Sequence, residues 1–372
     1  LLRLIDIVGA DNFDDEVLDT FESLNRGSSR LSDVHPDDLS QLQAAIASFT
    51  VRRTKTQLNA MVDAEPEAYR VAASGRICRY PLHVSQSYPL GESEEDQRIA
   101  GQIHALAKNL KGVGHFEKPL VLPESLARHG VSAESYLLMR LHSAGSLASH
   151  HVMAGLRSSR LALYRHILGE RNALLRMGLE GKIESSKDDS TGNMLQRIQW
   201  LKGKLPDNEL GIELPEWLRD EQAHCQACEA EIGIYEHILL RLEKLSSGRE
   251  QRKADLLLEL SIRHEQVIAF DHFPLTLRYI QHLMLKQAST AGVEVLLGVG
   301  GNKSANEKLQ KRLNPETGSG RLIALCSDAL SEGVNLQRAS TMVHLDMPSV
   351  VRYAEQRVGR AQPRTCALEG RP

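Results

Sequence analysis

The stretch from Ala324 to Arg360, ALCSDALSEGVNLQRASTMVHLDMPSVVRYAEQRVGR, decides the fold of the chain's carboxyl-terminal part. It contains the end of the apolar run RLIALC and the whole of TMVHLD, each followed by a polar segment. Short runs that stay apolar are typical of strands buried on both faces of a parallel sheet. Pro348 then turns the chain into SVVRYAEQRVGR, a predicted helix. The stretch therefore predicts strand, loop, strand and helix.

The same alternation of elements continues toward the amino terminus. The apolar runs EQVIAF (265–270) and VEVLLG (293–298) predict two more strands. The segments LTLRYIQHLMLKQAS (275–289) and SANEKLQKRLN (304–314) have helical spacing and follow them. Strands that alternate with helices indicate a parallel sheet covered by helices. The predicted fold class of this part is therefore α/β.

The preceding region has a different pattern, in which apolar residues recur at helical spacing. From about Gly91 to about Arg263 the chain is rich in Leu, Ala, Arg, Glu and His. The segments 149–180 and 219–245 each predict a long amphipathic helix, and the first 80 residues are also mostly helical in pattern. We therefore expect a mostly α-helical region before the parallel sheet.

Composition limits the class of protein. The chain has 372 residues, of which 41% are hydrophobic and 25% are charged, as in a soluble protein of two or three domains. No apolar run approaches the about 20 residues that span a bilayer, and no secretory signal is evident at the start, so no membrane partner is expected. The five cysteines are sparse and odd in number, which indicates a reducing compartment.

Charge is unevenly distributed along the chain. The net charge is −3, but residues 251–372 contain 16 Lys and Arg against 12 Asp and Glu, a net of +4, which leaves −7 for the rest. A mildly basic carboxyl-terminal third fits a polyanion or a nucleotide phosphate as partner, although the excess is small.

Two consecutive strand ends carry the residues of a predicted phosphate site. Ligands of open parallel sheets bind outside the carboxyl ends of the strands, where the loop SDALSEGVNLQ begins. Gly333 lets main chain approach a ligand closely, and Asn335 offers both a donor and an acceptor. Arg357 and Arg360 follow the next strand, and a planar guanidinium suits phosphate oxygens. We therefore expect a glycine loop and an arginine cluster at one edge of the sheet.

Other motifs favour structural roles. GVGGNKS (298–304) lacks the Gly-Lys-Ser/Thr of a phosphate loop, and Ser304 with Glu307 instead predicts a capping box. HCQAC (224–228) has no second ligand pair, so we expect helical cysteines rather than a zinc site. His142, His150 and His151 are interpreted as a solvated helical edge.

Taken together, the stretch 326–360 resembles motifs V and VI of the second RecA-like lobe of superfamily-two helicases and translocases, especially Swi/Snf-type ATPases of the RapA-like branch. RLIDIVGADNF (3–13) resembles the segment after motif III, and FTVRRTK (49–55) the end of the first lobe. QVIAFDHFPLTLRYIQHLM resembles motif IV, and VLLGVGGNKSANEKLQKRLN the unit after it. The resemblance implies a RecA-like carboxyl-terminal lobe.

The resemblance also implies the partners and the residue roles. ATP and Mg²⁺ are expected between two lobes, held mainly by the first, and double-stranded DNA is the expected track. Arg360 is the expected arginine finger, which catalyses transfer by meeting charge in the transition state. The remaining expected ATP-binding residues are Gln356, Arg357, Gly333, Glu332 and Asn335. The expected nucleic-acid contacts are Gly301, Asn302, Lys303 and Ser304, at a helix start.

The sequence departs from the family pattern in two places, and these departures affect the activity that we expect of the chain. Neither a Gly-Lys-Thr loop nor an Asp-Glu-x-His/Asp motif is present, so we expect a fragment that begins partway through the motor and is inactive alone. Pro363 replaces the second arginine of motif VI. The predicted domains are a helical tail of the first lobe (1–80), a helical insertion or linker (81–262) and a RecA-like lobe (263–372). We expect a bacterial, cytoplasmic, nucleoid-associated protein.

Two alternatives stay open at this point. Motifs V and VI barely distinguish a DNA translocase from an RNA-directed helicase of the same superfamily, although the Arg-Arg-Thr-Lys stretch favours DNA. A non-catalytic RecA-like binding module is the alternative from another class, and Pro363 favours it. The biological pathway is not indicated by any of these residues.

Overall fold

The computed structural model describes residues 35–37, 40, 44, 55–70, 77, 79, 84–183, 193–300, 303–313, 320–330, 339, 341–348 and 350–360, without the side chains at positions 55, 330, 351, 352, 359 and 360. The chain divides into two compact units. Residues 1–82 with 366–372 form the first, and residues 83–365 form the second.

The described part of the first unit contains α4 (Lys55–Ala64) and the short 3-10 helix η3 (Pro66–Tyr69). Arg79 lies 2.8 Å from Asp63, near the end of α4, and both side chains are exposed. An exposed ion pair of this kind contributes about 0–1 kcal/mol, so it adds little to the stability of the unit. Most of the FTVRRTK stretch, residues 49–54, lies outside the described residues.

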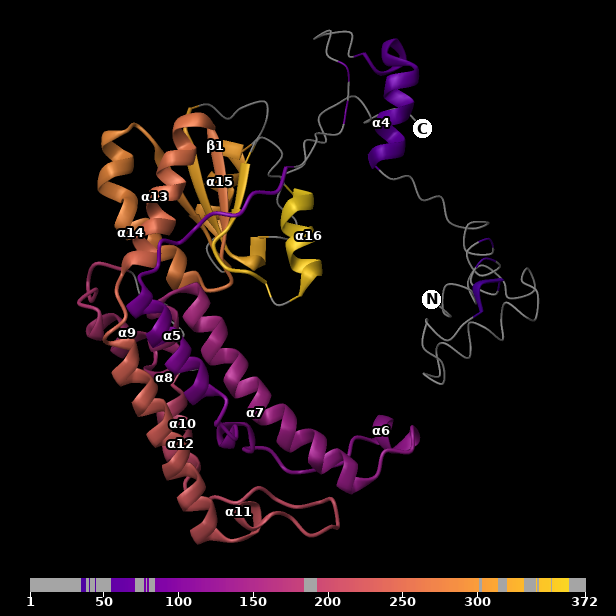
Figure 1. Cartoon of the computed structure of the whole chain (residues 1–372), viewed down its shortest axis with the longest axis vertical. Coiled ribbons are helices and arrows are strands. Elements are labelled where there is room, and N and C mark those ends of the chain that lie inside the picture. Colours follow the sequence, from indigo (N-terminus) through magenta and orange to yellow (C-terminus); the bar gives the residue numbers. More distant parts are fainter. Residues whose placement is uncertain are drawn as a thin grey trace. The chain divides into compact units, whose positions relative to one another are not determined.

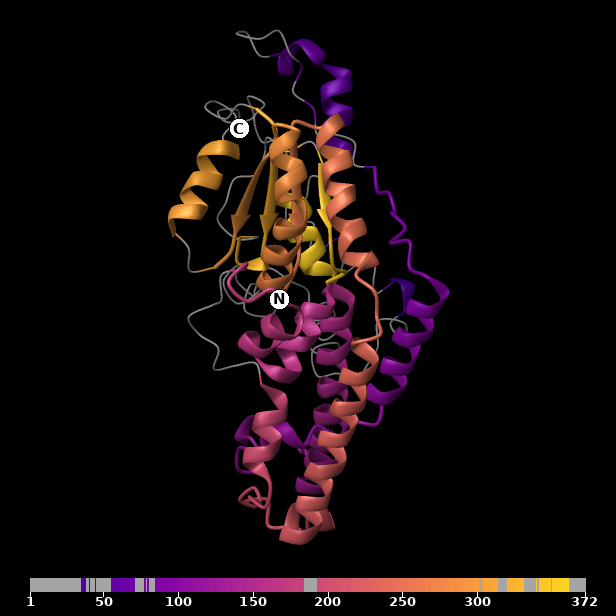
Figure 2. The same ribbon diagram turned by 90° about the vertical axis from the view of Figure 1, so that its left-hand side faces the viewer.

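The second unit contains a parallel sheet with the strand order β2–β3–β1–β4 among the described residues. Figure 2 shows the strands side by side. Ala269 stands opposite Leu325 on one side and Val343 on the other. The strands are β1 (Gln266–Phe270), β2 (Glu294–Gly298), β3 (Leu322–Cys326) and β4 (Thr341–His344). Every residue of β1 and β3 is buried, so the predicted parallel α/β sheet is confirmed.

Helices cover both faces of this sheet because successive strand residues point to opposite sides. On one face, Val267 and Leu325 pack with Leu277 of α14 and with α13. On the other, Phe270 and Ala324 pack with α15. The bounds of the helices around the sheet are α13 (Gly248–Arg263), α14 (Pro274–Thr290), α15 (Lys303–Leu313) and α16 (Val351–Arg360), with the 3-10 turn η5 (Asp328–Leu330) after β3.

The helical region precedes the sheet, as predicted, and has a core of its own (Figure 1). In that core Ile103 of α5, Val152 of α7, Leu163 of α8 and Ile238 of α12 are fully buried. The elements are α5 (Glu94–Ala107), η4 (Val113–His115), α6 (Glu124–Arg128), α7 (Ala133–Ser158), α8 (Arg160–Leu168), α9 (Glu170–Arg176), α10 (Met194–Leu201), α11 (Glu216–Arg219) and α12 (Glu221–Leu242). The described helices include none that is both long and apolar enough to cross a membrane.

The predicted long helix over 149–180 is wrong in its continuity, because the structure breaks it twice. Ser159 is extended (φ −164°, ψ 162°), and its hydroxyl accepts a hydrogen bond from the amide of Ala162, which caps α8. Gly169 has φ 83° and ψ 164°, a conformation that glycine adopts without a Cβ clash, and it starts α9. The other predicted long helix, 219–245, is confirmed as α12.

A buried polar junction joins the helical region to the sheet. It consists of Ser158, Ser159, Lys253, Asp271 and Thr276, all of which are buried. Ser158 Oγ donates to Asp271 Oδ1 at 2.7 Å and lies 2.6 Å from Thr276 Oγ1, while Lys253 Nζ donates to the carbonyl of Ser158 at 2.6 Å. These contacts are made away from water, so the junction fixes how the end of α7 meets the end of β1, and Asp271 Oδ2 is left without a hydrogen-bond partner among the described residues.

Candidate functional site

The carboxyl edge of the sheet is organised around one buried guanidinium. Arg357 of α16 is fully buried. Its Nε donates to Asp328 Oδ1 at 2.8 Å, and its Nη1 donates to Asp346 Oδ1 at 3.1 Å. Its Cζ also lies 5.5 Å from the centre of the Phe270 ring. We call Arg357, Asp328 and Asp346 the arginine clamp, which ties α16 to the chain that leaves β3 and β4.

Two histidines complete the electrostatics of the clamp. Burial acts to raise the pKa of Asp328, but its hydrogen bond with His272 and the charge of Arg357 together hold it below the usual value. The same hydrogen bond, 3.0 Å from His272 Nδ1 to Asp328 Oδ2, raises the pKa of His272. Burial, with the charge of Arg357, lowers the pKa of His344, so its Nδ1 can accept from Arg357 Nη1 at 3.2 Å.

Main-chain and hydroxyl contacts hold the same edge from other directions. The amide of His272 donates to Asp346 Oδ2 at 3.2 Å, so the loop after β1 is tied to the loop after β4. The hydroxyl of Tyr88, from the extended segment before α5, donates to the carbonyl of His344 at 2.7 Å. Burial raises the pKa of Tyr88 to about 12, so this hydroxyl stays protonated and keeps donating.

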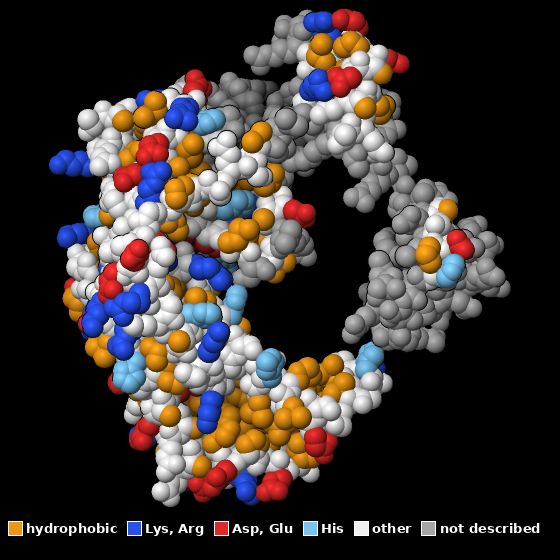
Figure 3. Space-filling view, viewed as in Figure 1, with side chains coloured by type: hydrophobic (Ala, Val, Ile, Leu, Met, Phe, Trp, Pro, Cys, Tyr) orange, Lys and Arg blue, Asp and Glu red, His pale blue; other side chains and the backbone are white. Residues whose placement is uncertain are grey.

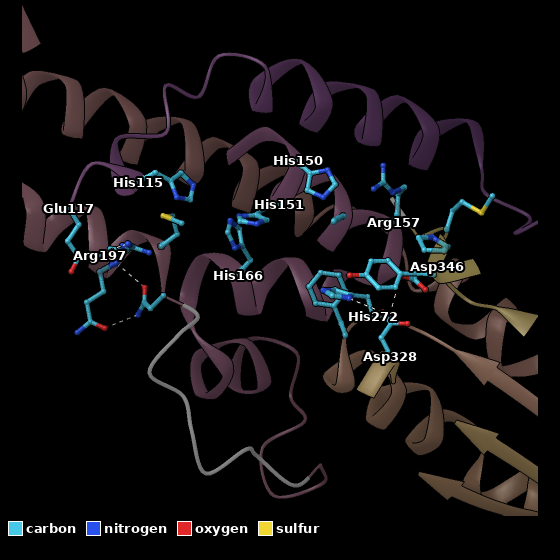
Figure 4. Close-up of a pocket in the computed structure, with 18 of the residues that line it drawn as sticks. His115, Glu117, His150, His151, Arg157, His166, Arg197, His272, Asp328 and Asp346 are labelled. Atoms are coloured by element: carbon cyan, nitrogen blue, oxygen red, sulfur yellow. Dashed lines mark hydrogen bonds and ion pairs between the residues drawn. The ribbon is translucent and has the colours of Figure 1, made fainter. Parts of the chain in front are cut away.

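A cavity of about 920 Å³ opens between this edge and the helical region. Figure 4 shows His272, Asp328, Asp346 and Arg157 at one end and His115, Glu117 and Arg197 at the other, with His150, His151 and His166 between them. The remaining lining residues are Ala154, Asn193, Met194, Gln196, Trp200, Phe273, Met347, Pro348 and Tyr353. The cavity is therefore shared between the strand ends and the helices α7, α8 and α10.

The central histidines of the cavity stay neutral. Burial lowers the pKa of His115 to about 4 and that of His166 to about 3, and the neighbouring imidazoles add to the shift. Burial also lowers the pKa of His151, whose ring centre lies 5.9 Å from that of His115 and 5.5 Å from that of His166. The Nε2 atoms of His115 and His166 are buried and have no hydrogen-bond partner among the described residues.

The structure places the residues of predicted motif VI on one helix. Gln356 is half-buried on α16, and its Oε1 is a buried acceptor without a partner among the described residues. Arg357 faces the interior, where the clamp holds it, and its predicted contact with ATP stays a prediction. Arg360 is the last residue of α16, and its side chain is not described. The predicted motif V residues Glu332, Gly333 and Asn335 lie outside the described residues.

The predicted nucleic-acid contacts begin α15. Gly301 and Asn302 lie outside the described residues, whereas Lys303 and Ser304 are described and exposed. The helix starts at Lys303, so Ser304 lies inside its first turn and the capping box predicted at Ser304 is wrong. This start follows β2, at one edge of the sheet, while α16 follows β4 at the other. Three strand spacings of about 4.8 Å separate the two, so the structure does not bring them together.

The sequence did not single out the cavity residues. The predicted solvated edge is wrong at His151, which is half-buried and lines the cavity, while His142 is exposed as predicted. His115 and His166 carry no local motif, because the three imidazoles come from segments that only the packing of η4, α7 and α8 brings together. The spacing of histidines along the chain gives no signal for such a cluster.

A zinc site would need several His, Cys, Asp or Glu side chains placed around one point. No group of three His, Cys, Asp or Glu side chains in the described part of the chain is placed to hold a metal ion. Cys228 is buried within α12, where burial raises the pKa of its thiol to about 11, and it lies 3.7 Å from His224 Nδ1. A thiol that stays protonated in this way is a poor metal ligand.

Comparison with known proteins assigns the carboxyl-terminal part. Residues 252–362 match the family of the helicase conserved C-terminal domain, and this segment contains all four described strands. No curated protein matches the chain. The crystal structure of the C-terminal part of the Fun30 ATPase domain is similar at 15% sequence identity and a TM-score of 0.32, over 77% of this chain and 82% of that one. Residues 252–362 are thus similar to this family, and their described strands form a parallel α/β sheet.

Proposed function

We propose that the chain is part of an ATP-dependent DNA translocase or remodelling ATPase of the Swi/Snf type, in which residues 252–362 act as the second motor lobe. The observation that carries this proposal is the helicase C-terminal domain match over the segment with the motif V and motif VI sequences. The parallel sheet, whose strand ends lead into these motifs, supports it. The RapA-like branch and the fragment character of the chain belong to the same proposal.

The arginine clamp gives Arg357 a positioning role in this proposal. Its guanidinium is fully buried, and its Nε and Nη1 donate to Asp328 and Asp346, so it is not exposed to a phosphate in this conformation. What the clamp does is fix α16 against the strand ends. Gln356 and Arg360, on either side of Arg357 in the helix, are thereby held at the edge where ligands of parallel sheets bind.

Gln356 and Arg360 are the residues of this chain proposed to meet ATP. The partnerless Oε1 of Gln356 fits a donor group of the nucleotide, because a buried acceptor without a partner is costly unless a ligand satisfies it. Arg360 is proposed as the finger that stabilises charge on the transferred phosphoryl group. Mg²⁺ supplies charge neutralisation on the phosphates, and a first lobe would hold it, since Asp328 and Asp346 are already occupied by Arg357.

The start of α15 is proposed as a contact with the nucleic-acid backbone. Lys303 and Ser304 are exposed in the first turn of an 11-residue helix, where main-chain amides favour an anionic group. Contacts of this kind position the protein without reading bases. Together with Gly301 and Asn302, these residues would follow a DNA strand as the two lobes close and open with each cycle of hydrolysis.

The test compares ATP hydrolysis with duplex DNA, duplex RNA and no nucleic acid in the protein that joins this chain to a first motor lobe. We expect stimulation by duplex DNA and no hydrolysis by the chain alone. Stimulation by RNA alone would replace the DNA translocase with an RNA-directed helicase. Hydrolysis by the isolated chain, or none in the joined protein, would contradict the proposed role of the second lobe.

A further inference from the structure

The histidine-lined cavity is not explained by a motor function. It is defined by His151 and His166 at its centre, His115 toward the far end and Arg157 at the end near the sheet. Its volume, about 920 Å³, lies within the roughly 300–1,000 Å³ of pockets that bind small organic ligands. Gln356, a proposed ATP contact, is not among the described residues that line it. It therefore needs an explanation separate from the ATP site.

The centre of the cavity offers unpaired hydrogen-bonding nitrogens rather than charge. The buried Nε2 atoms of His115 and His166 have no partner among the described residues, and both rings stay neutral near pH 7. Figure 4 shows His151 of α7 and His166 of α8 pointing toward one another across this part of the cavity. A neutral imidazole donates from one nitrogen and accepts at the other. Such a set suits a planar ligand with both donors and acceptors on its edge.

One end of the cavity carries a cation that can meet an anionic group. The side chain of Arg157 is exposed at the end of α7, and the structure gives its guanidinium no ion-pair partner among the described residues. Arg197, at the other end, is already paired with Glu117 at 2.7 Å. Figure 3 shows Lys and Arg side chains in blue on the face of the second unit that is turned to the viewer. Arg157 is thus the arginine of the cavity that is available to a ligand.

Aromatic rings complete the lining. Trp200 of α10, Phe273 after β1 and Tyr353 of α16 all line the cavity, and Trp200 and Tyr353 are more than a third exposed. The ammonium of Lys204 lies 3.5 Å from the centre of the Trp200 ring, which leaves the other face of that ring for a ligand. Exposed aromatic faces stack on the planar bases of nucleotides irrespective of sequence.

We propose that this cavity binds a nucleotide, with its base among His115, His151 and His166 and its phosphate at Arg157. The base supplies a planar edge of donors and acceptors for the two unpaired imidazole nitrogens, and the phosphate supplies the counter-charge for the guanidinium. This site is distinct from the ATP site proposed at Gln356 and Arg360. A free nucleoside monophosphate and an unpaired nucleotide of a strand share this chemistry and are the two sources of ligand to distinguish.

The experiment is a calorimetric titration of the full chain with AMP, with ribose 5-phosphate and inorganic phosphate in parallel. AMP should bind, and the two ligands without a base should bind at least about 10-fold more weakly, since stacking and imidazole contacts are lost. Equal binding of all three, or no binding of AMP, would overturn the proposal. A short single-stranded oligonucleotide that competes with AMP identifies the strand as the source, and one that does not compete identifies the free nucleotide.

Variants separate the cavity from other binding surfaces. Arg157→Ala changes an exposed side chain, so the fold should persist, and AMP affinity should fall about 10-fold because a charged hydrogen bond is lost. His166→Phe should abolish AMP binding, while His166→Gln keeps a polar group and should retain most of it. Arg219→Ala, on the exposed surface of α11 outside the cavity, is the matched control.

These experiments distinguish a failure of the cavity proposal from a failure of the proposed ATP site. Arg360→Ala should leave AMP binding by the chain unchanged, even where it removes ATP hydrolysis in the joined motor. If Arg157→Ala and His166→Phe bind AMP as the natural chain does, the cavity is not the site. A loss on Arg360→Ala alone would assign AMP to the motor site and overturn the proposal.

Discussion

The Nε atom of Arg357 lies 2.8 Å from Oδ1 of Asp328, and this ion pair joins α16 to the end of β3. The guanidinium is fully buried, so the helix that carries predicted motif VI is fixed by an internal charge pair rather than by surface contacts. An uncompensated charge in such a place is costly, which is why removing one partner is more damaging than losing an exposed pair. The clamp is therefore a structural requirement for whatever α16 does.

Replacing Arg357 should destabilise the second unit strongly. Arg357→Ala leaves the carboxylates of Asp328 and Asp346 without their cation, and we expect a loss of about 3–5 kcal/mol in the free energy of unfolding. Urea denaturation followed by circular dichroism measures it. Arg98→Ala, which breaks an exposed pair with Glu95, is the control and should change the free energy of unfolding little. Equal effects of the two variants would show that the clamp is not buried as described.

The neutral state of His166 should make the chain less stable in acid. Its folded pKa, about 3, lies below the ordinary value near 6.5, so the unfolded chain binds a proton first as the pH falls. The contribution of the neutral imidazole to the free energy of unfolding is fully present above pH 6.5, and about 2 kcal/mol of that contribution is lost at pH 5. His166→Gln should remove that loss in urea denaturation at pH 7 and pH 5. His142→Gln, at an exposed position of α7, should keep it, and identical pH profiles for both variants would refute the assignment.

The break between α8 and α9 should depend on Gly169. With φ 83° and ψ 164°, its backbone lies in a region that other residues avoid, so Gly169→Ala should destabilise the chain by about 1–3 kcal/mol. Gly101→Ala is the matched control, because Gly101 lies inside α5 with nothing within 4 Å of an added Cβ. It should instead stabilise the chain by about 0.5–1 kcal/mol. Thermal unfolding distinguishes the two, and effects of the same sign would contradict the described backbone.

Binding to nucleic acid should depend on the start of α15. Lys303→Ala removes one exposed cation, so duplex affinity should fall equally for unrelated sequences, and the slope of log affinity against log salt should become shallower by about 1. A filter-binding or anisotropy series over salt concentration measures both quantities. Lys118→Ala, at an exposed position in the helical region, should change neither. An unchanged salt slope in Lys303→Ala would place the nucleic-acid contact elsewhere.

The sheet could be predicted from the sequence because its strands are continuous apolar runs. β1 and β3 are buried along their whole length, and the helices α14, α15 and α16 follow the expected segments within one or two residues. The break at Gly169 was missed because the apolar spacing continues across it. A glycine alone does not reveal its φ before the packing is known.

The candidate site was predictable only in part. The pattern around Arg357 indicates an arginine at the strand ends, but not that Asp328 and Asp346 bury it. That outcome depends on where the loops after β3 and β4 meet, and no local spacing encodes it. The cavity depends on η4, α7 and α8, which bring His115, His151 and His166 together from distant parts of the chain.

The most direct measurement is steady-state ATP hydrolysis, with saturating duplex DNA, by the motor that joins this chain to a first lobe, before and after Arg360→Ala. The account predicts that kcat falls by about 10³-fold or more, because a finger meets charge that develops in the transition state, while ATP and DNA affinities change little. Arg128→Ala, an exposed control in α6, should hydrolyse ATP normally. A kcat that Arg360→Ala leaves unchanged would contradict the assignment of this lobe as the catalytic partner.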